Sequence, residues 1–332
     1  MDVNITKDMN LIKALAADAR HESLDSAVRE NMNNVIRTLA ADRNPMNLYQ
    51  IGQVMAYTVE ELERPMSNWL DLVADHKRIG AGEEAAFRTT ANGIKAFIQA
   101  KAGTTPRSRV ADKQIVVDTV AVSVRPAVNL LELATGKINF GDLAMYAAVE
   151  LANKKTAYVQ NVLNTAASSF ASPFYGTGSG IVAATFDPMV QHWMRTGGAA
   201  IIGDIAAVQK LAPLTGFTAS TNTQWGNGII EEFNRTGRIG TYKGAQVVQF
   251  VNPYETDGTT TALDKARLYI IPTTMSADAR TLKVVEQGGV ISVENTSINE
   301  LTYEVRMDEH FGAAVCYGNT PTVSVYYDST LG

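Results

Sequence analysis

The first 79 residues carry apolar side chains at every third or fourth position, the spacing of amphipathic helices. Pro45 and Pro65 interrupt this pattern, which predicts three or four short helices. Such helices bury their apolar stripes on a second surface, and either an arm lying over neighbouring subunits or a small helical subdomain would supply one. The recurring positions are Leu11, Leu15, Ala19, Leu24, Val28, Met32, Val35, Ile36 and Leu39.

A flexible joint, Gly-Ala-Gly at residues 80–82, precedes a segment with the pattern of a long hairpin. Residues 87–102 fit a strand or a short helix. From Ile115 onward apolar and smaller or polar residues alternate, which predicts a half-buried strand. Residues 103–109 join the two halves in a tip with little apolar content. Two interpretations are open: the tip is exposed to solvent and has no role, or it docks on another subunit. The tip carries Arg107, Arg109 and Lys113, and the apolar face of the strand carries Val116, Val120, Val122, Val124 and Val128.

A long helix follows and begins at Asp142, a favourable N-cap residue. About 26 residues at a rise of 1.5 Å each give roughly 39 Å, more than twice the usual helix length. Residues 153–155, Asn-Lys-Lys, mark its polar side. Its stripe lacks sustained heptads, so we expect it to pack on a sheet and not in a coiled coil. The stripe consists of Leu143, Ala147, Leu151, Tyr158, Val162 and Ala166.

The remainder predicts an α+β region. A Gly-rich loop spans 172–180, helices are expected over 188–195, 205–211 and 223–233, and residues 237–244 predict a turn-rich strand pair. Strands are expected over 245–251, 267–272, 281–287, 290–294 and 301–307. Gly288-Gly289 is typical of a hairpin turn between two of them.

The composition is that of a folded globular protein, with 45% hydrophobic and 19% charged residues. A net charge of −5 disfavours avid binding of nucleic acid. The single cysteine, Cys316, excludes an intramolecular disulfide framework. No apolar run approaches the roughly 18 residues of a spanning helix, so we expect a soluble chain without a membrane partner.

The sequence lacks a recognisable catalytic or metal-binding motif. The loop at residues 176–180, Gly-Thr-Gly-Ser-Gly, has neither the ending of a phosphate-binding loop nor the spacing of a nucleophile elbow. The four histidines are not spaced like zinc ligands, and we expect no metal or other cofactor. An enzyme would need a pocket that converges on His192 or His310. Adjacent carboxylates indicate solvated faces at 60–61, 83–84 and 231–232, and core or interface aromatics stand at Trp69, Trp193, Trp225, Tyr326 and Tyr327.

The order of these elements resembles the major capsid proteins of tailed bacteriophages, which share the Hong Kong 97 fold. The resemblance covers most of the chain from about residue 80 and rests on order and spacing more than on any one string. The strings that carry it are the Pro106-Arg107-Ser108-Arg109 tip, Gly237-Arg238-Ile239-Gly240-Thr241-Tyr242-Lys243-Gly244 and Phe311-Gly312-Ala313-Ala314-Val315.

The resemblance implies an α+β Hong Kong 97-like fold with a helical N-terminal arm, an extended β-hairpin loop, a long spine helix, a peripheral domain and an axial domain. The implied spans are 1–80 for the arm, 81–128 for the extended loop, 129–212 and 271–310 for the peripheral domain, 213–270 for the axial domain and 311–332 for C-terminal strands. Inter-subunit contacts are expected at the loop tip, at Thr105, Pro106, Arg107, Arg109 and Lys113.

The function that the resemblance implies is a non-enzymatic shell subunit of the virion, assembled in the bacterial cytoplasm into an icosahedral head around double-stranded DNA. An encapsulin-type compartment shares the fold and is the alternative. The expected partners are further copies of the chain in pentamers and hexamers, a portal, a scaffolding protein, a decoration protein, and DNA held without sequence readout. Because the sequence starts at Met1, we expect any scaffold to be a separate protein.

Overall fold

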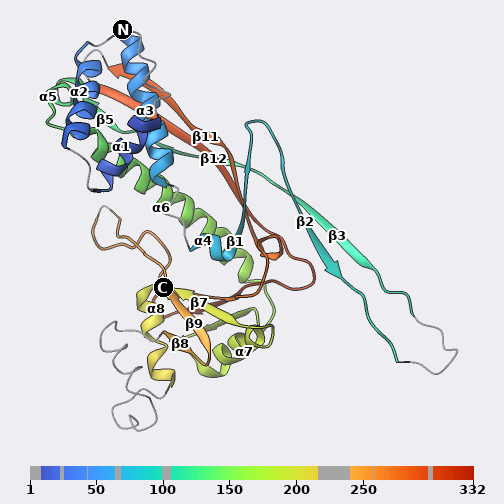
Figure 1. Ribbon diagram of the computed structural model, residues 1–332. Helices are drawn as coiled ribbons and strands as arrows, with labels where there is room; N and C mark the ends of the chain where they lie inside the picture. Colours follow the sequence, from blue (N-terminus) through green and yellow to red (C-terminus); the bar gives the residue numbers. More distant parts are fainter. Residues whose placement is uncertain are drawn as a thin grey trace.

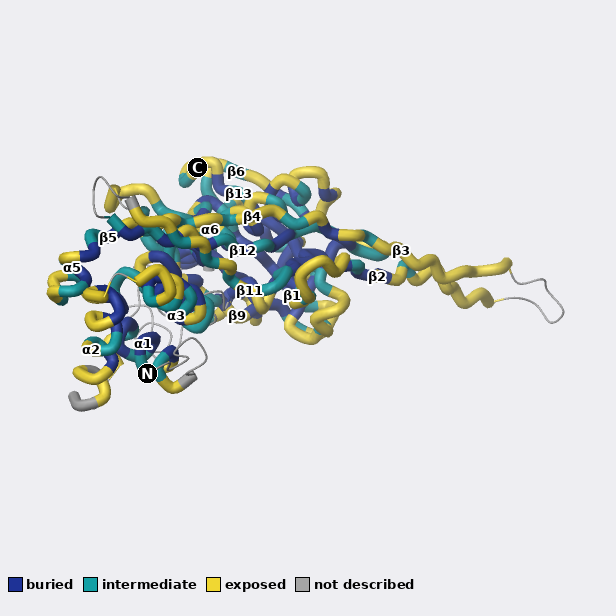
Figure 2. Tube along the Cα trace, turned by 90° about the horizontal axis from the view of Figure 1, so that it is seen from above, coloured by how far each residue is buried: buried dark blue, intermediate teal, exposed yellow. Residues whose placement is uncertain are grey.

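The computed structural model describes residues 9–22, 26–42, 44–63, 69–98, 106–215, 240–255, 257–297 and 302–332. The body is elongated, with a helical end, a mixed α/β lobe at the other end, and one long helix running between them (Figure 1). A two-stranded hairpin leaves the body and extends well beyond it (Figure 2).

The N-terminal helices pack on their own chain. They are α1 (Met9–Ala19), α2 (Ser26–Asp42) and α3 (Pro45–Glu63), and Pro45 is the first residue of α3, where a proline is well tolerated. They share a core with α5 (Leu130–Thr135), the first half of α6 (Phe140–Ala167) and β12 (Thr302–Val315). The predicted helices are therefore confirmed, and the described part of this region packs on its own chain as a helical subdomain. The core residues include Leu15, Met32, Ile36, Ile51, Leu62, Leu151, Tyr303 and Met307.

The predicted arm also contains an unforeseen strand. After the short helix α4 (Leu70–Val73), β1 (Ala74–Ile79) pairs in parallel with β11 (Leu282–Ser297). Together with β12, β4 (Val120–Val124) and β5 (Ala127–Asn129) it forms a five-stranded sheet, ordered β1-β11-β12-β4, with β5 also on β12. The sheet thus joins segments from the two ends of the chain.

The prediction of a hairpin turn at Gly288-Gly289 is wrong. β11 runs through both glycines as one strand of 16 residues. Its pairing with β12 shifts register between Gln287 and Ile291, and Gly288 adopts φ +74°. The glycines therefore accommodate a β-bulge, which needs the same backbone freedom as a turn.

Helix α6 is two residues longer than expected, with 28 residues and about 42 Å of length. Its N-cap is Asn139, whose side chain accepts a hydrogen bond from Gly141 N, so Asp142 lies inside the first turn. The predicted stripe is correct at Leu151, but Tyr158 is 39% exposed. The buried apolar residues in the second half are Val159, Leu163 and Ala167.

The second lobe is built on a six-stranded sheet ordered β6-β13-β10-β7-β9-β8. Helix α7 (Ala183–Met194) and the short α8 (Ile205–Gln209) accompany it, close to the ranges expected. The strands are β6 (Tyr175–Gly178), β7 (Ala199–Gly203), β8 (Thr241–Tyr242), β9 (Ala245–Gln249), β10 (Arg267–Pro272) and β13 (Ser324–Asp328). The large aromatics of its core are Trp69, Phe186, Trp193, Tyr242, Tyr269 and Tyr326.

The boundaries of the sheets differ from the expected domain boundaries. Residues 129–212 serve both sheets, because α5 and α6 adjoin the five-stranded one while β6 and β7 lie in the six-stranded one. The final strand β13 returns to the second lobe, as considered for residues 311–332. The expected helix 223–233, Trp225 and residues 237–239 lie outside the described residues. The rest of the expected 237–244 strand pair is described, and there β8 pairs with β9 in antiparallel register.

The alternating segment after Ile115 divides among three strands. Residues 110–117 form β3 (Val110–Val117), which pairs with β2 (Ala85–Asn92). The segment 87–102, which fits a strand or a short helix by sequence, is thus a strand as far as Asn92. The residues after Thr119 leave the hairpin and form β4 and β5 in the five-stranded sheet.

None of the described helices is long and apolar enough to span a bilayer.

Candidate functional site

The root of the hairpin is anchored on the body. β2 and β3 pair in antiparallel register from Ala85 opposite Val117 to Asn92 opposite Val110. The side chains that face inward at the root have a small apolar core of their own, which fixes the direction in which the hairpin leaves the body. This core consists of Ala85, Phe87, Val117 and Val285.

Residues 317–319 of the same chain also support the paired strands. Lys113 Nζ donates to Gly318 O at 3.4 Å and lies 5.8 Å from the ring centre of Tyr317. Asn319 Nδ2 donates to Asn92 O at 2.6 Å. Lys113 was expected at the hairpin tip; it lies instead within β3 and contacts its own chain.

Beyond this support lies the outer hairpin, defined here as residues 93–98 and 106–109. Every one of these residues is exposed, and none belongs to a strand. Ile94 is 64% exposed, Phe97 is 43% exposed and Ile98 is fully exposed. Large apolar side chains that protrude together into water are typical of a surface that another molecule covers.

The predicted tip residues are only partly described. Pro106, Arg107 and Arg109 lie in the outer hairpin and are exposed, whereas Thr105 falls outside the described residues. Their role between subunits stays a prediction. The apolar residues at 94, 97 and 98 were missed because residues 87–102 were not resolved between strand and helix; their spacing in a protruding segment was the available signal.

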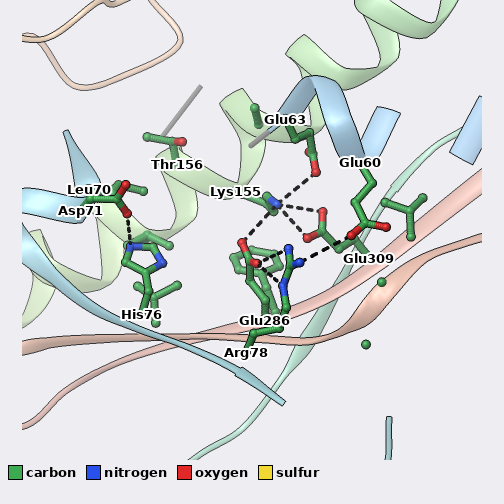
Figure 3. A pocket seen from close by; sticks show the side chains of 17 residues that line it. Glu60, Glu63, Leu70, Asp71, His76, Arg78, Lys155, Thr156, Glu286 and Glu309 are labelled. Atoms are coloured by element: carbon green, nitrogen blue, oxygen red, sulfur yellow. Dashed lines mark hydrogen bonds and ion pairs between the residues drawn. The ribbon is translucent and has the colours of Figure 1, made fainter. Parts of the chain in front are cut away.

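At the foot of the hairpin, α3, α6, β1, β11 and β12 enclose a cavity of about 310 Å³ (Figure 3). Lys155 of α6 projects into its centre. Its Nζ donates to both carboxylate oxygens of Glu309 at 2.8 Å and to Glu63 Oε2 at 3.3 Å. The ionisable residues that line the cavity are Glu60, Glu63, Asp71, His76, Arg78, Lys155, Glu286 and Glu309.

A second cation neutralises the opposite side of the cavity. Arg78 of β1 donates to Glu286 Oε2 from Nη2 at 3.0 Å and lies 3.5 Å from Glu60 Oε1. Glu286 Oε1 also lies 3.8 Å from Lys155 Nζ. One lysine and one arginine thus tie the end of α3 to the spine helix and to the five-stranded sheet.

The charges perturb one another strongly. Burial raises the pKa of Glu63 to about 8, because it outweighs the opposing charge of Lys155, and the nearby Glu309 carboxylate adds to the rise. Burial alone would lower the pKa of Lys155, but the carboxylates of Glu63 and Glu309 outweigh it and raise that pKa. Burial likewise opposes ionisation of Glu286, yet Lys155 and Arg78 hold its pKa below the usual value.

The sequence did not predict this cluster. Lys155 was assigned to the polar side of the helix, but its side chain is only 15% exposed. Glu60 was assigned to a solvated face, and it contacts Arg78. The signal is absent from local sequence, because the carboxylates that meet Lys155 come from elements far away along the chain.

The other chemical candidates serve the fold. The glycine loop is filled by its own chain, since Gly180 N donates to Asp328 Oδ1 at 2.9 Å. His192 packs edge-on against Phe174 and Trp193, and His310 pairs within the sheet with Ala121. Among the described residues, no group of three or more histidine, cysteine or acidic side chains is arranged to hold a metal ion.

The comparisons with known proteins place this geometry among capsid subunits. The family model described as "SPbeta prophage-derived putative capsid protein YonB" matches residues 2–325. None of the curated protein sequences matches the chain.

Solved structures of phage capsids share the fold. The mature capsid of bacteriophage PhiM1 is 12% identical, with a TM-score of 0.50 over 78% of this chain and 87% of that one. Microbacterium phage Oxtober96 and Mycobacterium phage Adephagia each give 12% identity and a TM-score of 0.50, over 77% of this chain and 89% of theirs. The Hong Kong 97-like fold expected from sequence is therefore confirmed.

Proposed function

Because the chain belongs to the family of the SPbeta prophage-derived capsid protein YonB, we propose that it is the major capsid protein of a tailed bacteriophage. A capsid protein is a component of the virion and works by self-association. The chain would build the icosahedral head shell that encloses the double-stranded DNA genome.

The observation that carries this proposal is the outer hairpin on a capsid fold. Ile94, Phe97 and Ile98 protrude from the body and belong to neither of its two large apolar cores. Covering these residues needs a second molecule. A shell supplies one at every position, since closed symmetry repeats each modest contact many times.

The finer assignments are also proposals. The hairpin is the extended loop that overlaps a neighbour, the five-stranded sheet with α6 is the peripheral domain, and the described part of the six-stranded lobe belongs to the axial domain. Pentamers and hexamers of the chain, assembled in the host cytoplasm, would form the shell. A portal, a scaffolding protein and a decoration protein are the expected further partners.

The DNA inside would be confined without sequence readout, as the net charge of −5 suggests. No enzymatic activity is needed for this role, and the charge cluster around Lys155 is proposed to hold the spine helix against the sheet. Because Lys155 bridges α3, α6 and β12, it would transmit any displacement of the helical end to the sheet.

Electron microscopy of the purified chain tests the proposal. We expect closed shells of uniform diameter, formed with or without a co-expressed scaffold. Monomers under every assembly condition would contradict it. The phage family favours a head over an encapsulin-type compartment, and shells that enclose an enzyme in place of DNA would reverse that choice.

A further inference from the structure

The cavity beside Lys155 contains more carboxylates than cations. Lys155 and Arg78 are its only permanent cations among the lining residues. The Glu63 side chain is 7% exposed, and its Oε1 atom has no hydrogen-bond partner in the described part of the chain. A buried carboxyl oxygen without a partner is costly, so a ligand that brings a cationic donor, and thereby stabilises the ionised form of Glu63 that burial disfavours, would be favoured here. The lining carboxylates are Glu60, Glu63, Asp71, Glu286 and Glu309.

The outer hairpin offers the complementary chemistry. The sequence from residue 93 to 110 contains Lys95, Lys101, Arg107 and Arg109 and no aspartate or glutamate, in a chain whose net charge is −5. Arg107 and Arg109 are exposed, and the described residues provide neither with an ion-pair partner. The described residues therefore include two exposed arginines without an ion-pair partner, and an acidic cavity in which Glu63 Oε1 has no hydrogen-bond partner.

One molecule cannot bring the two together. Both views show the hairpin running away from the body, whereas the cavity lies at its foot, between α6 and the sheet (Figures 1 and 2). The root contacts of Lys113 and Asn319 hold this direction. The basic segment can thus reach such a cavity only on another copy.

We propose that the cavity between α3, α6, β1 and the β11–β12 pair receives the basic outer hairpin of a second copy, with an arginine guanidinium donating to Glu63 Oε1. This inference rests on the proposed shell function and adds the receiving site. Arginine suits the site better than lysine, because its planar fork can donate to two carboxylate oxygens at once. A cavity of about 310 Å³ is in the range of small-ligand sites.

Disulfide trapping in assembled shells tests the docking directly. Ser108→Cys places a thiol between the two arginines and keeps both, and Gly289→Cys places one at the cavity lining. A Cβ at Gly289 would lie 3.3 Å from Glu60 Oε2, a distance that a small side-chain shift accommodates. We expect the pair to form disulfide-linked multimers on oxidation of shells and none in unassembled subunits.

The matched control pairs Ser108→Cys with Ala41→Cys, an exposed position on α2 away from the cavity. Shells that form normally but link Ser108→Cys to Ala41→Cys, or fail to link it to Gly289→Cys, would overturn the docking and leave the shell function intact. Failure of the unsubstituted chain to form any shell would instead reject the proposed function.

A double-mutant cycle provides a second test without cysteines. We expect Arg107→Gln with Arg109→Gln to raise the subunit concentration needed for assembly about tenfold, and Glu60→Gln with Glu63→Gln to do the same. Combining all four should add little, because each pair removes the same contact. Additive effects would contradict the pairing, while Arg88→Gln, on the supported part of β2, should leave assembly unchanged.

Discussion

Replacement of Glu63 by glutamine should change how the stability of the unassembled subunit depends on pH. Glu63 faces Lys155 from α6, Glu309 from β12, Glu286 from β11, and Glu60 and Arg78 across the same cavity. Burial raises its pKa from 4.5 to about 8 in the folded chain. Between these values the folded state holds a proton that the unfolded chain releases.

The sign and size of the effect follow from this linkage. The free energy of unfolding falls as the pH rises through the window, by at most about 1.4 kcal/mol per pH unit. The upper bound over the window is about 5 kcal/mol, since each pKa unit is about 1.4 kcal/mol. Glutamine keeps the shape and has no proton to lose. Relative to the parent, Glu63→Gln should gain about 2 to 5 kcal/mol in unfolding free energy between pH 5 and pH 9.

Urea unfolding followed by tryptophan fluorescence measures this difference, at protein concentrations where light scattering shows no assembly. Glu84→Gln serves as the control, because Glu84 is exposed and does not line the cavity. Parent and Glu63→Gln profiles that stay parallel from pH 5 to pH 9 would refute the assignment of a proton to buried Glu63.

Three further substitutions test other parts of the structure. Leu151→Asp should unfold the subunit, because it buries an unpaired charge at a 1% exposed position. Val162→Asp, at the partly exposed edge of the stripe, should leave a folded chain with a lower melting temperature. Equal effects of the two substitutions would show that α6 is rotated from its assigned face. Trp193→Phe removes the buried 2.9 Å hydrogen bond from Nε1 to Ser324 Oγ and should lower the free energy of unfolding by about 1 to 3 kcal/mol, measured in urea. An unchanged free energy of unfolding would mean that Ser324 Oγ has another hydrogen-bond partner. Replacing residues 93–109 with an Asn-Gly turn between the paired residues Asn92 and Val110 should leave melting unchanged but abolish shells by light scattering; normal assembly would make the outer hairpin dispensable.

The parts of the fold that sequence predicted well depend on local periodicity. The strand at 267–272 was predicted with the bounds that the structure has, because a short apolar run rich in β-branched and aromatic residues is typical of a buried strand. The spine helix was found because no proline or glycine interrupts residues 142–167. Leu151 was placed correctly because Ala147 and Ala148 precede it on the same face of the helix.

The wrong predictions share a physical cause: contacts between residues far apart in the sequence determine the structure at these positions. Gly288-Gly289 permits a turn or a bulge, and only pairing with β12 selects the bulge. Lys155 is an ordinary surface residue until Glu63 and Glu309, 92 and 154 positions away, are brought beside it. By sequence, the apolar stripes of the N-terminal helices could pack on neighbouring subunits or on their own chain, and only the structure shows that they pack on α6.

We propose that this chain buries its protruding apolar side chains by lying against copies of itself. A side-chain-resolution cryo-electron microscopy reconstruction of the particles tests it most directly. We expect Ile94, Phe97 and Ile98 of each subunit to be covered by an adjacent subunit. Particles in which these three side chains stay in solvent, or pack on their own body, would contradict it.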